Sequence, residues 1–157
     1  MAQLARVIRL DESDDRVFAQ PAETGEWAIS GAFEFSNATE DDLTGQRRQA
    51  FANGWLGLET FGRASVVAVT AITEAELDML ATTLARHFVE RYGAPGEAQA
   101  RPVALEELRH TVDLCDEYPP NTLILVERTL ESVGVRERFR AVEPRAASLD
   151  SFAVHGE

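Results

Sequence analysis

The sequence predicts an α+β protein of two layers, in which a mixed or mainly antiparallel sheet carries two main helices packed on one face. Short apolar segments rich in β-branched and aromatic residues lie in both halves of the chain, and two long amphipathic segments lie between them. Polar turns containing Asp, Gly and Pro separate these segments. Adjacent helices between buried strands favour a sheet that is covered by helices on one side.

The first 35 residues are predicted to form strands and a hairpin. Residues 4–10 are mostly apolar and predict a strand, and the acidic run at 11–15 predicts a turn after which residues 16–20 pair back. This run is not an EF-hand loop, because arginine and alanine stand where that loop needs glycine and glutamate. Residues 27–35 alternate apolar side chains with small or polar ones, which predicts a half-buried strand.

The middle of the chain is predicted to hold an irregular helix and a central strand. Residues 39–54 begin with Thr39 and two aspartates, as helices often do, and end at Gly54, while Gly45 interrupts the segment. Residues 64–72 are apolar on both faces and rich in β-branched side chains. This pattern is typical of a strand in the centre of a sheet.

Two long helices follow. Thr73 and Glu76 form a capping-box pattern at the start of the first, whose apolar stripe is Leu77, Leu80, Ala81, Leu84 and Phe88. Gly93 and Pro95 end it. The second helix is predicted over residues 102–118, before two prolines, and its inner side is formed by Leu105, Leu108, Val112 and Cys115.

The C-terminal segment is predicted to form two strands. Residues 121–130 read as a strand buried on both faces in its first half, and residues 134–142 as a final edge strand. The tail at 144–157 is expected to be loosely ordered. Because no linker composition interrupts the chain, residues 1–157 are predicted to form a single domain.

Composition excludes several classes of function. The formal net charge of −12 repels polyphosphate, so we expect no nucleic acid and no anionic membrane as a partner. All 15 basic residues are arginine, which removes the ε-amine that Schiff-base chemistry and a P-loop require. The single cysteine, Cys115, and the absence of a signal-peptide pattern predict a cytoplasmic protein.

The segment "NGWLGLETFG", residues 53–62, combines three glycines with aromatic and aliphatic side chains. Its glycine spacing differs from the dinucleotide-binding pattern G-x-G-x-x-G, and a strand follows it instead of a helix. We interpret it as a connection whose hydrophobic side chains pack onto the sheet. The alternative is an aromatic-lined pocket or interface, with Trp55 and Phe61 as candidate contacts.

Three arginines alternate along the last predicted strand: Arg136, Arg138 and Arg140. On a strand, all three project from one face. Charged side chains often protect the edge of a sheet from aggregation, and this is the first interpretation. The alternative is a groove that binds an anion or an acidic partner, since arginine suits carboxylate and phosphate groups.

No residues are predicted to be catalytic, and no metal or cofactor is expected. The pairs His87 with Glu90 and Glu107 with His110 have the spacing of carboxylate-bridged metal sites. On a helix, however, His110 lies about 200° from Leu108, on the wet side. We therefore interpret these pairs as solvated charges, and Cys115 as a buried, inert thiol. The balance of these observations is against an enzyme.

Four segments together resemble a small uncharacterised family of proteobacterial single-domain proteins of unknown function: "RVIRLDESDDRVF", "GEWAISGAFEF", "RQAFANGWLGLETFG" and "LARHFVERYGAP". The resemblance covers most of the chain. It implies no activity, cofactor or catalytic residue.

Two hypotheses of function follow. The first is a non-catalytic accessory or interaction domain that binds another protein or itself, a homodimer included. The second is a domain that binds a small anionic or aromatic ligand. That ligand would lie in a pocket between the strand at 27–35 and Trp55. The second hypothesis requires an apolar cavity of about 300 Å³ or more beside an arginine.

Overall fold

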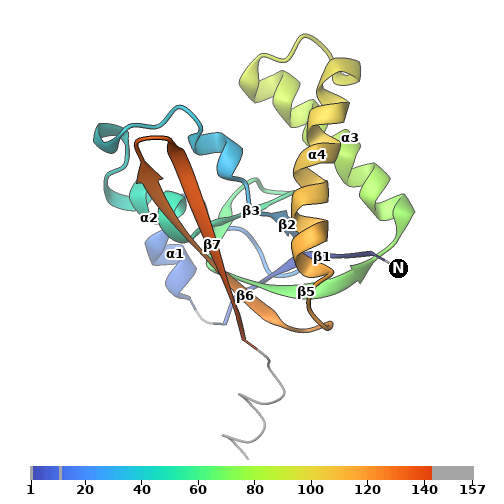
Figure 1. Cartoon of the computed structure of the whole chain (residues 1–157), viewed down its shortest axis with the longest axis horizontal. Helices are drawn as coiled ribbons and strands as arrows, with labels where there is room; N and C mark the ends of the chain where they lie inside the picture. Colours follow the sequence, from blue (N-terminus) through green and yellow to red (C-terminus); the bar gives the residue numbers. More distant parts are fainter. Residues whose placement is uncertain (1, 11, 143–157) are drawn as a thin grey trace, which may run out of the picture.

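The computed structural model describes residues 2–10 and 12–142 of the chain (Figure 1). Its strands are β1 Ala2–Ile8, β2 Trp27–Ile29, β3 Trp55–Gly57, β4 Arg63–Ala64, β5 Val66–Ile72, β6 Leu123–Glu131 and β7 Gly134–Val142. Its α-helices are α1 Ser13–Val17, α2 Gly45–Asn53, α3 Glu74–Tyr92 and α4 Glu97–Cys115. Two 3-10 helices, η1 Ala32–Phe35 and η2 Glu40–Asp42, lie between β2 and α2.

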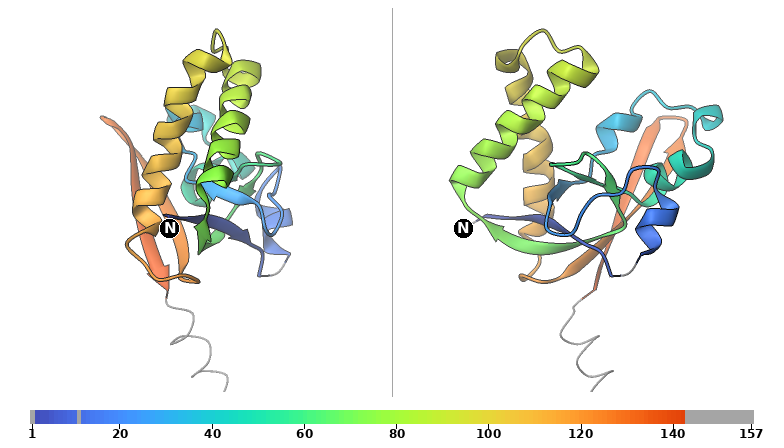
Figure 2. Two further views of the ribbon diagram at one scale, coloured as in Figure 1. Left: turned by 90° about the vertical axis from the view of Figure 1, so that its right-hand side faces the viewer. Right: turned by 180° about the vertical axis from the view of Figure 1, so that it is seen from behind.

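The seven strands form one sheet in the order β4-β3-β2-β1-β5-β6-β7, and all neighbouring strands are antiparallel. The sheet is strongly curved (Figures 1 and 2). Its curvature brings β3 close to β7. The evidence is that the rings of Trp55 and Phe139 lie 5.6 Å apart. The Asn53 side chain also donates a hydrogen bond of 3.1 Å to the carbonyl of Val126 in β6.

The two faces of the sheet bury two separate hydrophobic cores. Because side chains alternate along a strand, Leu4 and Ile72 lie on one face and Ala5 and Val69 on the other. The first face packs against α3 and α4, which form an adjacent pair. The second core lies among the strands and is joined by Cys115 at the end of α4. The prediction of an α+β fold with a mainly antiparallel sheet is therefore confirmed.

The strongest local signals gave the right elements. Thr73 caps α3, and its hydroxyl accepts a hydrogen bond from the Glu76 backbone in a capping box. Gly93 ends α3 in the left-handed conformation, with φ of 73°. β5 is a central strand between β1 and β6, and β7 is an edge strand. The predicted tail at 144–157 lies outside the described residues.

Two segments differ in type from the prediction. Residues 13–17 form α1, where a turn and a returning strand were expected. The reason is the buried Asp14 carboxylate, which accepts hydrogen bonds from the backbone and hydroxyl of Ser65. The strand predicted at 27–35 ends at Ile29, because Gly31, with φ of 75°, turns the chain into η1.

Boundaries also differ from the prediction in two helices. Gly45 begins α2 and does not interrupt it, since the capping box at Thr39 belongs to the short helix η2. The helix α4 starts at Glu97, so that Pro102 lies inside it. Leu105 was expected on the inner side of α4, yet 46% of its surface is exposed, because the buried stripe of this helix passes through Ala104 and Leu108.

Candidate functional site

Most of the glycine-rich segment 53–62 belongs to a β-hairpin, to which it contributes β3 and the loop that leads to β4. The backbone of Gly57 donates to the carbonyl of Gly62 at 2.9 Å. The glycines permit close contacts: a Cβ at Gly57 would lie 2.4 Å from Glu26 Oε1, and one at Gly62 would lie 2.6 Å from the Pro21 carbonyl. The third glycine of the segment, Gly54, does the same, since its Cβ would lie 2.7 Å from the Ala50 carbonyl, so all three glycines make room for neighbouring groups.

The buried carboxylate of Glu26 holds the loop of this hairpin. It accepts hydrogen bonds from the backbone of Glu59 at 2.9 Å, from the backbone of Thr60 at 2.8 Å, and from the Thr60 hydroxyl at 2.7 Å. Gln20 adds a hydrogen bond of 2.7 Å to the Thr60 carbonyl. A carboxylate that accepts several backbone N–H groups fixes a loop in one conformation. The next residue, Phe61, therefore has a fixed position.

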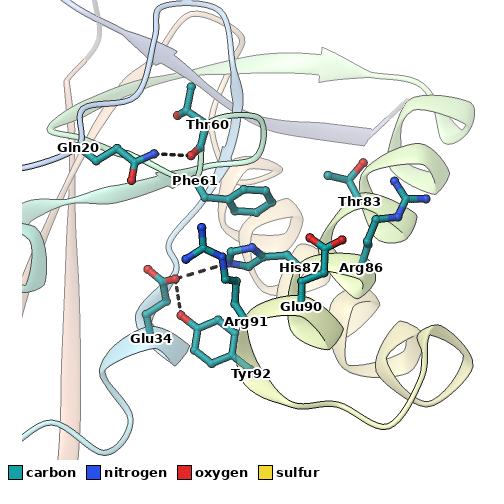
Figure 3. A pocket seen from close by; sticks show the side chains of 10 residues that line it. All are labelled: Gln20, Glu34, Thr60, Phe61, Thr83, Arg86, His87, Glu90, Arg91 and Tyr92. Carbon is teal, nitrogen blue, oxygen red and sulfur yellow. Dashed lines mark hydrogen bonds and ion pairs between the residues drawn. The ribbon is translucent and has the colours of Figure 1, made fainter.

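Phe61 has a strained backbone and stacks on a histidine of α3. Its φ of 57° lies in the left-handed region, which is uncommon for a bulky residue. Its ring lies 3.7 Å from that of His87, with an angle of 2° between the two planes. Strained residues persist where the surroundings over-determine them, and they cluster at functional sites. Figure 3 shows the two rings one over the other.

A cavity of about 510 Å³ lies beside this stack (Figure 3). One wall is the hairpin loop with Thr60 and Phe61, and the other is a polar face of α3. Five side chains of α3 share this face, because their spacing of three and four residues places them on one side of a helix. They are Thr83, Arg86, His87, Glu90 and Arg91.

The end of the cavity is formed by Glu34 of η1, whose carboxylate accepts hydrogen bonds from the Tyr92 hydroxyl and from Arg63. Burial alone would raise the pKa of Glu34, but the charge of Arg63 and the two hydrogen bonds lower it overall. Burial and the hydrogen bond to Glu34 raise the pKa of Tyr92. Glu34 is thus an anion at neutral pH and Tyr92 its neutral donor.

His87 is the buried polar group that this network leaves without a partner. Its exposed fraction is 9%. Its Nε2 atom lies 3.7 Å from Glu34 Oε2, which is too long for a hydrogen bond. Within the described residues, Nε2 has no hydrogen-bond partner. Burial lowers the pKa of His87, and the nearby Glu34 opposes this shift only in part, so the imidazole is neutral at pH 7.

Two buried arginines hold the backbone next to the site through hydrogen bonds. Arg63 donates to the backbone carbonyls of Gly31 and Gly54, and Arg128 donates to those of Phe51 and Gly54. Burial lowers the pKa of Arg63 to about 10, against the opposing effect of Glu34, so both groups keep their charge at neutral pH.

A second cavity, of about 410 Å³, adjoins the first across Glu34, Phe61 and Tyr92. It is lined by Phe35 and by two arginines, Arg47 and Arg63. The site therefore has cationic groups on both sides of Glu34.

The residues that the sequence predicted as ligand or partner contacts lie in three different parts of the fold. Phe61 lines both cavities. Trp55 is fully buried in the second core, so its indole offers no surface to a ligand or partner there. Residue 55 faces the core because β3 alternates and its neighbour Leu56 takes the other face. The three arginines of β7, Arg136, Arg138 and Arg140, are all exposed, and none of them lines either cavity.

The other titratable groups form no site of their own. Within residues 2–10 and 12–142, no three His, Cys, Asp or Glu side chains lie close enough to hold a metal ion. His110 is exposed on α4, as its helical position predicts. Cys115 is buried, and burial raises the pKa of its thiol to about 12. In the part of the chain that the structure describes, no helix is long and apolar enough to cross a membrane.

Sequence reasoning identified Phe61 but missed Glu34, Arg63 and Tyr92. Glu34 was placed on the polar side of a strand that does not exist beyond Ile29. A usable signal was present on α3, where five polar side chains from Thr83 to Arg91 follow helical spacing next to the apolar stripe. The partners of that face come from the loop before β4 and from η1, which are distant from α3 in sequence.

Comparison with known proteins gives one match. The sequence model of a family of unknown function (DUF6505) matches residues 1–157. No curated protein and no solved structure matches the chain.

Proposed function

This chain belongs to the DUF6505 family of unknown function, and we propose that its cavity beside His87 binds a small molecule with an anionic group. The observation that carries the proposal is His87, which lines the cavity and whose buried Nε2 atom lies near Glu34 without a hydrogen-bond partner among the described residues. A buried polar atom without a partner costs about 1–3 kcal/mol. A ligand removes this cost when the His87 ring turns and brings Nε2 to it.

The cations of α3 favour an anion. Arg86 directly precedes His87 and Arg91 lies one turn after it, and all three line the cavity. Arg91 makes no hydrogen bond or ion pair within the described part of the chain, and Arg86 has only a 3.6 Å contact with the exposed Glu97. Glu34 is paired with Arg63, so Glu90 is the acidic group of this wall that opposes the two arginines. An arginine guanidinium binds carboxylate and phosphate in a two-pronged geometry.

The flat Phe61–His87 stack favours a ligand with a ring. Ring edges or faces presented to a cavity bind flat apolar groups, at about 0.5–1.5 kcal/mol per aromatic pair beyond simple burial. The size of the cavity, about 510 Å³, lies within the range of about 300–1,000 Å³ for small-molecule sites. The cavity has the size and the arginines that the sequence hypothesis required, but its walls are mostly polar where apolar walls were expected, and Phe61 stands in place of Trp55 as the aromatic group.

Calorimetry with four simple probes tests the proposal. Benzoate and phenyl phosphate carry a ring and an anion, acetate carries only the anion, and benzamide carries only the ring. We expect the first two to bind more tightly than the last two. The double variant Arg86→Gln/Arg91→Gln should lose about tenfold or more in affinity for benzoate, as expected for removal of charged hydrogen bonds of about 1.5–3 kcal/mol.

The control is Arg109→Gln, an exposed arginine of α4 outside this cavity. It should bind benzoate as the unaltered protein does. Equal weakening by both variants would show a non-specific charge effect. Benzamide binding as tightly as benzoate would contradict an anionic ligand.

The second candidate function is a protein-interaction module, and one observation favours it. β7 is a nine-residue strand at the edge of the sheet. Exposed edges are sites where another chain can add a strand. Sedimentation of the full chain, with and without a candidate partner, tests this function independently of the cavity.

A further inference from the structure

We infer that the free edge of β7 binds an extended acidic segment of another protein by adding a strand to the sheet. This inference rests on the second candidate function and not on the His87 cavity. The surface consists of the edge of β7 and of its outer face, which carries Arg136, Arg138 and Arg140.

The backbone of β7 is open on one side. It pairs with β6 along its whole length, from Gly134 opposite Glu131 to Val142 opposite Leu123. On its other side, no strand of the described residues pairs with it, because β7 is last in the sheet order. The row of N–H and C=O groups on such an edge is a template for one more antiparallel or parallel strand.

The two faces of β7 differ in what they present. Glu137 and Phe139 point inward, where Phe139 contacts Trp55 and Glu137 pairs with the buried Arg128 at 2.9 Å. The arginines alternate with them and point outward, where all three are exposed. An added strand therefore places every second side chain beside an arginine.

Local acid groups do not cancel this arginine face. Arg138 lies opposite Glu127, and Arg136 is 3.6 Å from Glu131, but both contacts are exposed pairs of low value. Arg140 lies opposite Leu125, which carries no charge. A cavity of about 330 Å³ opens along this face and includes Arg138 and Arg140 in its wall.

A second copy of this chain is a poor occupant. When two copies pair as antiparallel strands about a twofold axis, the side chains that point to the same face of the sheet lie opposite each other. A register centred on Glu137, Arg138 or Phe139 then sets arginines opposite arginines. Like charges directly opposite each other destabilise a strand pair. The charges on this edge therefore disfavour pairing with a second copy of the chain.

An acidic segment is the complementary occupant. Carboxylates at alternate positions of the added strand lie beside the three arginines, and opposite charges on neighbouring strands stabilise the pairing. The net charge of −12 repels an acidic partner at long range. Salt at 0.1 M screens this repulsion beyond about 10 Å, so the nearby arginines dominate the electrostatic interaction at the edge. Main-chain hydrogen bonds provide affinity, and the alternate carboxylates provide specificity.

Amide hydrogen exchange of the full chain with synthetic peptides tests the inference. The probe is a blocked peptide of alternating Glu and Thr with the length of β7. The comparison peptides replace Glu with Lys, or keep Glu and carry N-methyl groups on alternate amides. We expect only the first peptide to slow exchange in β7. The N-methylated peptide keeps the charge but cannot form the ladder.

Two charge-reversal variants complete the test. R136E/R138E/R140E should bind the Glu peptide about tenfold more weakly or worse, and should bind the Lys peptide instead. R16E/R48E/R109E makes the same change in net charge at exposed sites elsewhere and should bind as the unaltered chain does.

Three results would overturn the inference. Equal binding of the N-methylated peptide would exclude strand addition, and protection of β7 by the Lys peptide would exclude an acidic partner while leaving an interaction role for this edge. A dimer in sedimentation that protects β7 without any peptide would identify a second copy as the occupant.

Discussion

At the scale of single residues, the glycines of the hairpin make room for a buried carboxylate. Glu26 is 3% exposed and takes three hydrogen bonds from Glu59 and Thr60. Gly57 lies so close to it that any Cβ would displace the carboxylate. The loop that positions Phe61 thus depends on a contact between residues that are distant in sequence.

The first prediction concerns Gly57→Ala. Its added methyl group would meet Glu26 Oε1 at 2.4 Å, so Glu26 must move and lose hydrogen bonds to the loop. We expect a loss of about 1–3 kcal/mol in the free energy of unfolding, measured by urea denaturation. Gly96→Ala is the control, because its Cβ meets only the flexible end of Gln99. Equal losses in both variants would contradict this account of Gly57.

The second prediction concerns the strained backbone of Phe61. Both Phe61→Gly and Phe61→Ala remove the ring that stacks on His87. Only glycine adopts φ of 57° without steric cost, and the cost for other residues is about 1–2 kcal/mol. The glycine variant should therefore be at least as stable as the alanine variant in thermal unfolding. A clearly more stable alanine variant would show that the loop relaxes and that Phe61 is not held under strain.

At the scale of elements, the sequence predicts those whose stability is local. The capping box at Thr73 and the apolar stripe of α3 lie within one segment, and β6 and β7 are joined by a short turn. The end of β2 depends on distant groups. The carbonyls of Ser30 and Gly31 accept hydrogen bonds from Arg63 and Arg128 and not from a strand, so the ladder stops at Ile29.

α1 shows the same limit. Its acidic residues read as a solvated turn, yet Asp14 is buried against Ser65, a residue that lies between β4 and β5. No periodicity within residues 11–20 carries this information. The candidate site has the same character, because Glu34, Phe61 and His87 come from three elements that only the fold brings together.

The third prediction concerns Arg128, which joins α2, β2 and β7. Its guanidinium is 2% exposed and donates to Phe51, Gly54 and Glu137. Arg128→Lys keeps the charge but loses the planar set of donors, so carbonyls and a carboxylate remain buried without partners. We expect a loss of about 3–5 kcal/mol in unfolding free energy. Arg140→Lys, on the exposed face of the same hairpin, should change it by less than about 0.5 kcal/mol.

At the scale of the whole molecule, the curved sheet explains why one hairpin loop can face two cavities. The curvature brings β3 to β7 and sets the loop at 58–62 opposite α3. The net charge of −12 repels anions from most of the surface. An anion can therefore bind only where positive side chains are concentrated. The arginines of α3 and β4 form such a concentration around Glu34.

The pH dependence of binding follows from the state of His87. Burial lowers its pKa, so the free protein holds a neutral imidazole at pH 7. An anion next to Nε2 favours the charged form and raises this pKa, so binding takes up a proton. Affinity for benzoate should therefore increase as pH falls from 7 through the pKa of the bound state, and level off below the pKa of the free state.

The most direct measurement is the NMR titration of the His87 imidazole nitrogens with pH, with and without saturating benzoate. The account predicts that benzoate raises the pKa of His87 and leaves the signals of His110, exposed on α4, unchanged. A His87 titration that benzoate does not shift, or equal changes at His110, would contradict an anion-binding site in this cavity.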